Sequence, residues 1–208
     1  PSRWCDAVNG PDLAAVLATA FGRLSDSSDE LRELDAAVGD GDLGVTVTKG
    51  AAAVESRLAA LPPDVRPSDV IRATADAFGN ANPSTFALLV SYGLVAGART
   101  AEECNEITTS DVITIGRAAA AAIMRRGKSS VGDKTVLDAL VPSLDAAELH
   151  PSDGTAALTA AIAAASAGIA DATGMASKKG RAAWAGERGI GVPDAGATAY
   201  LRFLEALH

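Results

Sequence analysis

Acidic side chains and glycines alternate in the stretch from Leu34 to Gly44. Asp35, Asp40 and Asp42 fall within eight residues of one another, and the glycines beside them let the backbone bend so that the three carboxylates face one space. Three converging carboxylates repel one another unless a hard cation neutralises them. Mg²⁺ prefers oxygen ligands in a near-octahedral array and commonly takes phosphate oxygens too. The stretch therefore predicts a site for Mg²⁺ and a nucleotide, with a solvated acidic turn or a helix cap as the plain alternative.

Two other binding motifs fail on their spacing. An EF-hand loop that began at Asp40 would need a ligand at Gly44 and a glutamate at Ala51, so this kind of calcium site is excluded. The segment 127–129, Gly-Lys-Ser, matches the end of a phosphate-binding P-loop. Ala122 stands where that motif requires its first glycine, and the preceding segment has a helical pattern. We therefore discard the P-loop as well.

Histidine and cysteine are poorly placed for nucleophilic catalysis. His150 is expected at a helix end, His208 is the last residue, and neither Cys5 nor Cys104 has a basic neighbour in the sequence. The chemistry must therefore rest on carboxylates, amides and cations. Such groups suit phosphoryl transfer, which depends mainly on positioning and on neutralising charge.

Basic residues are concentrated in a glycine-rich segment near the end of the chain, from Lys178 to Ala195. The segment shows no helical periodicity. Its charged residues lie between glycines: Lys178, Lys179, Arg181, Glu187, Arg188 and Asp194. We predict a mobile loop that faces phosphates, with an ordinary solvated loop as the alternative.

The rest of the chain consists of segments with helical spacing of apolar residues. Alanine and other aliphatic residues dominate, aromatic residues make up only 4%, and strict period-two alternation is not found. Four polar or glycine-rich segments interrupt the helices, at 39–44, 79–84, 127–132 and 178–195. The pattern predicts an all-α fold, an antiparallel bundle or barrel of about eight helices with the nucleotide site in the loops at one end. We expect one domain over residues 1–208.

Charge and composition exclude several classes of protein. The formal net charge of -8 disfavours nucleic acid and anionic lipid surfaces as partners. The Ala-rich stretches are interrupted by polar residues, so we expect no membrane span. The first nine residues lack the build of a secretory signal, and the two cysteines form no disulfide or metal pattern. These features predict a cytoplasmic protein with reduced thiols.

Three separated segments resemble motifs of one known family, the L subunit or C-terminal DAK2-type domain of dihydroxyacetone kinases. Residues 34–44 resemble its L-D-x-x-I-G-D-x-D-H-G motif, and residues 132–142 are similar to G-D-K-T-M-x-D-x-x-x-P. Residues 179–198 are similar to K-G-R-A-x-x-x-G-E-R-x-x-G-x-x-D-P-G-A-T. The order and spacing of the motifs also agree, so the resemblance spans nearly the whole chain.

The resemblance implies a bundle of eight antiparallel helices that holds ADP or ATP through two Mg²⁺ ions. Asp35, Asp40 and Asp42 would be the metal ligands, and Arg181 and Asp40 would be the catalytic residues. The nucleotide would be contacted by ten residues: Thr46, Gly79, Asn80, Asn82, Ser84, Gly132, Asp133, Arg181, Asp194 and Gly196.

The resemblance also implies a partner. In this family a K subunit binds the ketose covalently through a histidine, and a phosphotransfer protein recharges the bound ADP in some members. Leu43 replaces the usual histidine of the first motif, and residues 79–84 depart from the usual G-G-A-S-G-P. The acceptor is therefore expected to be dihydroxyacetone, a tetrulose or another short ketose. A non-catalytic ADP-binding module and a purely structural helical domain are the alternative functions.

Overall fold

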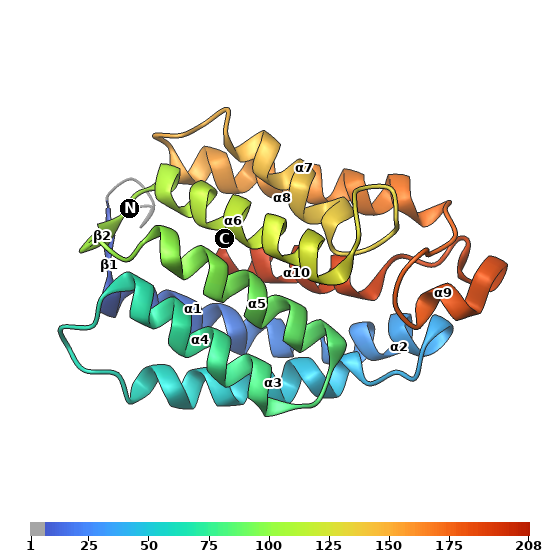
Figure 1. Cartoon of the computed structure of the whole chain (residues 1–208), viewed down its shortest axis with the longest axis horizontal. Coiled ribbons are helices and arrows are strands. Elements are labelled where there is room, and N and C mark those ends of the chain that lie inside the picture. Colours follow the sequence, from blue (N-terminus) through green and yellow to red (C-terminus); the bar gives the residue numbers. More distant parts are fainter. Residues whose placement is uncertain (1–6) are drawn as a thin grey trace.

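The computed structural model describes residues 7–208 and is almost entirely helical (Figure 1). Nine of its helices have 11 to 20 residues. They are α1 (Gly10–Ser25), α2 (Ser28–Val38), α3 (Leu43–Ala59), α4 (Pro67–Ala81), α5 (Thr85–Thr100), α6 (Thr109–Gly127), α7 (Leu137–Ala147), α8 (Gly154–Thr173) and α10 (Ala195–Leu207). Short elements complete the chain: α9 (Ala182–Ala185), the 3₁₀ helix η1 (Gly186–Gly189), β1 (Val8–Asn9) and β2 (Glu106–Ile107).

Eight of these helices form a closed antiparallel ring. Each helix packs against the next in the order α1, α3, α4, α5, α6, α7, α8 and α10, and α10 packs back against α1. Neighbours in the ring run in opposite directions (Figure 1). Helix α2 lies outside the ring beside α9, where it lengthens one end of the molecule. The predicted all-α bundle of eight antiparallel helices is confirmed, with α2 as an additional helix.

Local signals in the sequence explain where several helices begin. Asn9 caps α1 through its side-chain oxygen, which accepts a hydrogen bond from the backbone of Asp12 at 2.9 Å, and a proline occupies the first turn. Thr108 and Asp111 form a reciprocal capping box at the start of α6. The amphipathic face of α1 then buries Phe21 in the core. Its ring lies 5.5 Å from that of Phe78, between ring centroids.

Some predicted boundaries are wrong. Helix α4 begins at Pro67, because proline is well suited to the first helical position. It continues to Ala81, so Gly79 and Asn80 lie in its last turn rather than in a loop. Residues 8–9 and 106–107 form a short antiparallel pair of strands, which no alternating apolar pattern in the sequence predicts.

Helix α8 corrects the expectation that no segment could span a membrane. Within residues 7–208 it is the one helix long and apolar enough to do so by length and composition. Those criteria do not distinguish a membrane span from a core helix. In this fold α8 packs against α7 and α10. Cys5 and most of the N-terminal stretch considered for a secretory signal lie outside the described residues.

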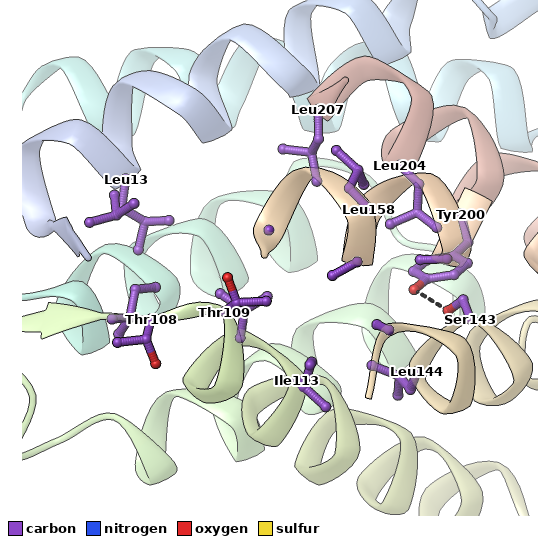
Figure 2. A pocket seen from close by; sticks show the side chains of 17 residues that line it. Leu13, Thr108, Thr109, Ile113, Ser143, Leu144, Leu158, Tyr200, Leu204 and Leu207 are labelled. Carbon is purple, nitrogen blue, oxygen red and sulfur yellow. Dashed lines mark hydrogen bonds between the residues drawn. The ribbon is translucent and has the colours of Figure 1, made fainter. Parts of the chain in front are cut away.

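The loops divide into two sets at opposite ends of the ring (Figure 1). One end carries residues 39–42, 82–84, 128–136 and 174–194, so the four polar segments gather as predicted. The other end carries the β1–β2 pair and the loop between α7 and α8. From this second end a cavity of about 130 Å³ extends between α6, α7, α8 and α10. Figure 2 shows its mostly aliphatic lining, with Tyr200 hydrogen-bonded to Ser143.

Candidate metal and nucleotide site

The three predicted metal ligands converge at the junction of α2 and α3. Carboxylate oxygens of Asp35, Asp40 and Asp42 lie within 4.8 Å of one another. Asp35 is on the last turn of α2, and the other two lie in the turn that follows it. Gly41 makes this turn possible because its φ of +73° is readily adopted only by glycine. The end of α2 and the four-residue turn after it thus bring three carboxylates close together.

The charge of this acidic cluster is only partly compensated by the backbone. Asp35 accepts a hydrogen bond from the backbone nitrogen of Leu43 at 3.3 Å. The pKa of Asp42 is raised above its ordinary value, first by burial and second by the negative charge of Asp35. A cation among these oxygens relieves the repulsion and favours the ionised forms. The donor set, three carboxylates partly open to solvent, fits a hard divalent ion such as Mg²⁺.

Arg181 reaches the acidic cluster from the far end of the sequence. Its guanidinium forms ion pairs with Asp40 and, at 3.2 Å, with Asp42, which lies 139 residues earlier. Arg181 precedes α9, which packs against α2. A planar guanidinium beside carboxylates is also well suited to phosphate oxygens. The structure therefore brings the two predicted catalytic residues, Arg181 and Asp40, into contact.

The segment between α4 and α5 is joined to the start of α3 by side chains. Asn82 donates a hydrogen bond to the hydroxyl of Thr46 at 3.0 Å and accepts one from Lys49 at 3.4 Å. Thr46 is buried. Ser84 precedes α5 as its N-cap residue, and its side chain makes no capping hydrogen bond. These contacts place Asn82 and Ser84 in the same set of loops as the acidic cluster.

Gly79 and Asn80 have structural roles in α4. A Cβ atom at Gly79 would lie 2.8 Å from the side chain of Ser91, so the glycine permits close packing of α4 against α5. The side chain of Asn80 donates to the carbonyl of Asp76, one turn back in the same helix, at 2.8 Å. The prediction that these two residues belong to a loop is therefore wrong. The small side chains that suggested a break are used for packing.

Residues 128–136 form a loop whose backbone is held by carboxylates. Asp138 accepts hydrogen bonds from the backbone nitrogens of Gly132 at 2.6 Å and Thr135 at 2.7 Å. Asp133 accepts from the backbone of Ser130, and this bond is the main reason that its pKa is lowered. Asp133 also forms ion pairs with Lys178 at 3.6 Å and with Lys179 at 3.8 Å. Its carboxylate thus connects this loop to the basic segment.

Lys134 is the main residue of this end that the predictions omitted. It is buried, and its ammonium donates to the carbonyls of Thr173 at 3.1 Å, Met175 at 2.9 Å and Gly189 at 2.7 Å. Burial lowers its pKa, and the charge of Asp194 opposes this shift. One side chain thereby holds both ends of the segment that carries Arg181. The signal in the sequence that could have identified Lys134 is its place within the G-D-K-T motif of residues 132–135.

Asp194 caps the last helix. Its side chain accepts a hydrogen bond from the backbone of Ala197 at 2.8 Å. Burial raises its pKa to about 6, and the nearby Asp138 adds to this effect, whereas the backbone hydrogen bonds and Lys134 oppose it. Gly196, in the first turn of α10, lies against the ring of Phe86. Both of these predicted nucleotide contacts therefore lie at the start of α10.

Comparisons with known proteins agree with this architecture. The sequence profile of the DAK2 domain matches residues 37–208. A D-erythrulose kinase from Mycolicibacterium smegmatis is 35% identical over 89% of this chain, which covers 33% of that enzyme. The ADP-binding subunit DhaL of the PEP-dependent dihydroxyacetone kinase of Escherichia coli is 27% identical, and the match covers 88% of both chains.

A solved structure has the same fold. The dihydroxyacetone kinase from C. freundii, crystallised with AMP-PNP and Mg²⁺, superposes with a TM-score of 0.75 at 24% identity. The match covers 99% of this chain and 35% of that enzyme. The chain thus spans about a third of the length of the D-erythrulose and C. freundii kinases but most of the length of the DhaL subunit. Because the DAK2 profile matches most of its length, the chain belongs to the DAK2 domain family.

Proposed function

We propose that this chain is the ADP- or ATP-binding half of a dihydroxyacetone-type kinase. The observation that carries the proposal is the convergence of three carboxylates within 4.8 Å, beside the guanidinium of Arg181. The E. coli relative is named an ADP-binding subunit, and the C. freundii kinase was crystallised with AMP-PNP and Mg²⁺. A cytoplasmic location is part of the same proposal.

In this proposal Asp35, Asp40 and Asp42 would hold two Mg²⁺ ions together with the nucleotide. The ions would neutralise charge on the transferred phosphoryl group and orient it. Arg181 pairs with Asp40 and Asp42, so a metal ion would compete with its guanidinium for these two carboxylates. When metal and nucleotide bind, the guanidinium is expected to turn toward the phosphates, which are its other natural partner.

The remaining nucleotide contacts come from the surrounding loops. Asn82 and Ser84 lie at the N-terminus of α5, where backbone nitrogens and the helix dipole favour phosphate. Gly132 contributes from the adjacent loop. Thr46 and Lys49 position Asn82 through the hydrogen bonds described above. Asp133 and Asp194 carry negative charge, so their contribution is to hold loops in place rather than to touch phosphate.

The acceptor must be supplied by another protein or domain. Both histidines of the chain are remote from the acidic cluster, since His150 follows α7 and His208 follows α10 at the other end of the bundle. We therefore assign the short ketose, dihydroxyacetone or a tetrulose, to a separate K-type subunit or domain. The phosphoryl donor is either ATP or a phosphotransfer protein that recharges bound ADP, as the PEP-dependent E. coli relative suggests.

Calorimetry with Mg·ADP tests the binding site. The wild-type chain is expected to bind in a Mg²⁺-dependent manner, and Asp40→Ala is expected to lose most of the affinity. Asp64→Ala, which removes an exposed carboxylate from the other end of the bundle, is the matched control and should bind like the wild type. Equal affinity in all three proteins would remove the proposed site.

A second assay separates the kinase from a binding module. A K-type subunit, ATP and dihydroxyacetone or erythrulose are supplied together, and the phosphorylated ketose is measured. Product that depends on Asp40 supports the kinase. Tight ADP binding without product from any short ketose identifies a non-catalytic ADP-binding module instead.

A further inference from the structure

An exposed tryptophan lies next to the proposed nucleotide site. Trp184, on α9, has 85% of its surface exposed, more than any other large apolar residue in the described part of the chain. Its backbone nitrogen donates to the carbonyl of Arg181, the residue that contacts the acidic cluster. A fully solvated indole does not contribute to the core. Aromatic side chains of this kind are enriched where proteins contact one another.

Other exposed apolar side chains surround the same end of the bundle. They are Val45, Val131, Met175 and Ile190, with exposures of 45%, 49%, 39% and 48%. We call these four residues and Trp184 the apolar rim.

The apolar rim is built on the segments that form the site. Val45 follows Asp42 by three residues at the start of α3, and Val131 precedes Gly132. Lys134 holds the carbonyl of Met175 and that of Gly189, the neighbour of Ile190. A protein or domain that covers the acidic cluster must therefore also cover the apolar side chains around it.

The proposed reaction requires a protein or domain in this position. An acceptor oxygen has to come within about 3 to 3.5 Å of the phosphoryl group, so the protein that holds the ketose must lie directly over the nucleotide. The remaining two thirds of the D-erythrulose kinase lie outside the region matched by this chain, whereas the DhaL subunit is matched over most of its length. The rest of the enzyme is therefore part of the same chain in the D-erythrulose kinase and a separate subunit in the DhaL system.

We propose that Trp184 is the anchor by which the apolar rim docks onto the ketose-binding subunit. The inference rests on the proposed function and adds to it a named contact residue. The partner is expected to offer an apolar recess for the indole. Carboxylates beside that recess would complement the exposed Lys178 and Arg188, whose positive charge contrasts with the net charge of -8 on the whole chain.

Affinity for the ketose-binding subunit of the same organism tests this assignment. We expect Trp184→Ala to raise the dissociation constant about 30-fold, because a tryptophan at the centre of an interface is commonly a dominant contact. Leu149→Ala is the matched control, since Leu149 is 77% exposed but lies at the other end of the bundle. It should change the constant less than about twofold.

Binding of Mg·ADP and self-association are measured on the same variants. Trp184→Ala should bind Mg·ADP like the wild type. A loss of Mg·ADP affinity would mean that the indole stacks on the nucleotide, and a wild-type dimer abolished by Trp184→Ala would identify a second copy of this chain as the occupant. Either result overturns the proposal, as does subunit affinity that is absent in the wild type or equal in Trp184→Ala. Failure of the proposed function is distinct, because it would appear as wild-type protein that does not bind Mg·ADP.

Discussion

The two ends of the helical ring are stabilised in different ways. At the site end, contacts join residues far apart in the sequence, such as Arg181 with Asp42 and Lys134 with the carbonyl of Gly189, 55 residues away. At the other end, the β1–β2 pair also joins distant residues, but two helices are capped by near neighbours in the sequence. Thr108 and Asp111 cap α6 three residues apart, and Asp153 caps α8 by accepting from Ala156.

The ends also differ in what they enclose. The site end gathers carboxylates and cations that are half exposed, whereas the other end opens into an aliphatic cavity (Figure 2). Exposed charged side chains that bind a ligand are not fixed by packing in the core, so other contacts must hold the loops that carry them. Here the hydrogen bonds of the buried Lys134 hold the segment that carries Arg181. Substitutions of the buried residues that hold the loops of the site end should therefore affect stability and nucleotide binding together, while those of the capping residues at the other end should affect stability alone.

The largest effect is expected for Lys134→Met. The substitution keeps the apolar stem but leaves three carbonyls without their donor, at a cost of about 4 kcal/mol in the free energy of unfolding. Mg·ADP affinity should fall as well, because the segment that carries Arg181 is released. Urea unfolding and calorimetry measure the two effects. Lys178→Met, which alters an exposed lysine, should cost less than about 1 kcal/mol, and equal losses in both variants would contradict the assigned role of Lys134.

Asp194→Asn should have an effect that depends on pH. Because the folded-state pKa of Asp194 is raised from 3.8 to about 6, its contribution to stability is complete below about pH 4 and is lost as the pH rises through 6. Asparagine keeps the capping oxygen without the charge. The variant should therefore gain stability relative to the wild type between pH 4 and 7, by up to about 3 kcal/mol. Unfolding curves at a series of pH values check this, and a constant difference would show that the carboxyl does not titrate there.

A smaller effect, confined to stability, is expected for Thr108→Ala. Loss of the capping box should lower the free energy of unfolding by about 1 kcal/mol. Since Thr108 lies at the end remote from the acidic cluster, Mg·ADP affinity should be unchanged. Weakened binding in calorimetry would show that the two ends are coupled and that the comparison between them is too simple.

The same contrast explains how much of the molecule its sequence predicts. The cap of α1 and the apolar faces of the helices depend on residues within a turn of one another, and the antiparallel bundle follows from them. The convergence of Asp35, Asp40 and Asp42 is equally local, because a single turn creates it. These features could be predicted without knowledge of the tertiary structure.

Other features depend on partners that are distant in the sequence. The sequence predicts a loop at Gly79 because the packing partner of this glycine, Ser91, belongs to another helix. The sequence does not single out Lys134, because the three carbonyls that it holds lie 39 to 55 residues later. A basic residue inside a helical protein is predicted to be exposed unless its distant acceptors are known.

The central claim, that three aspartates hold divalent metal against a nucleotide, is tested most directly with Mn²⁺ in place of Mg²⁺. Electron paramagnetic resonance measures the free Mn²⁺ that remains when protein and ADP are added. The wild type and Asp64→Ala are expected to remove two equivalents of Mn²⁺ from solution, and Asp35→Ala and Asp40→Ala are expected to remove little more than ADP alone. Mn²⁺ uptake in those two variants equal to that of the wild type would contradict it.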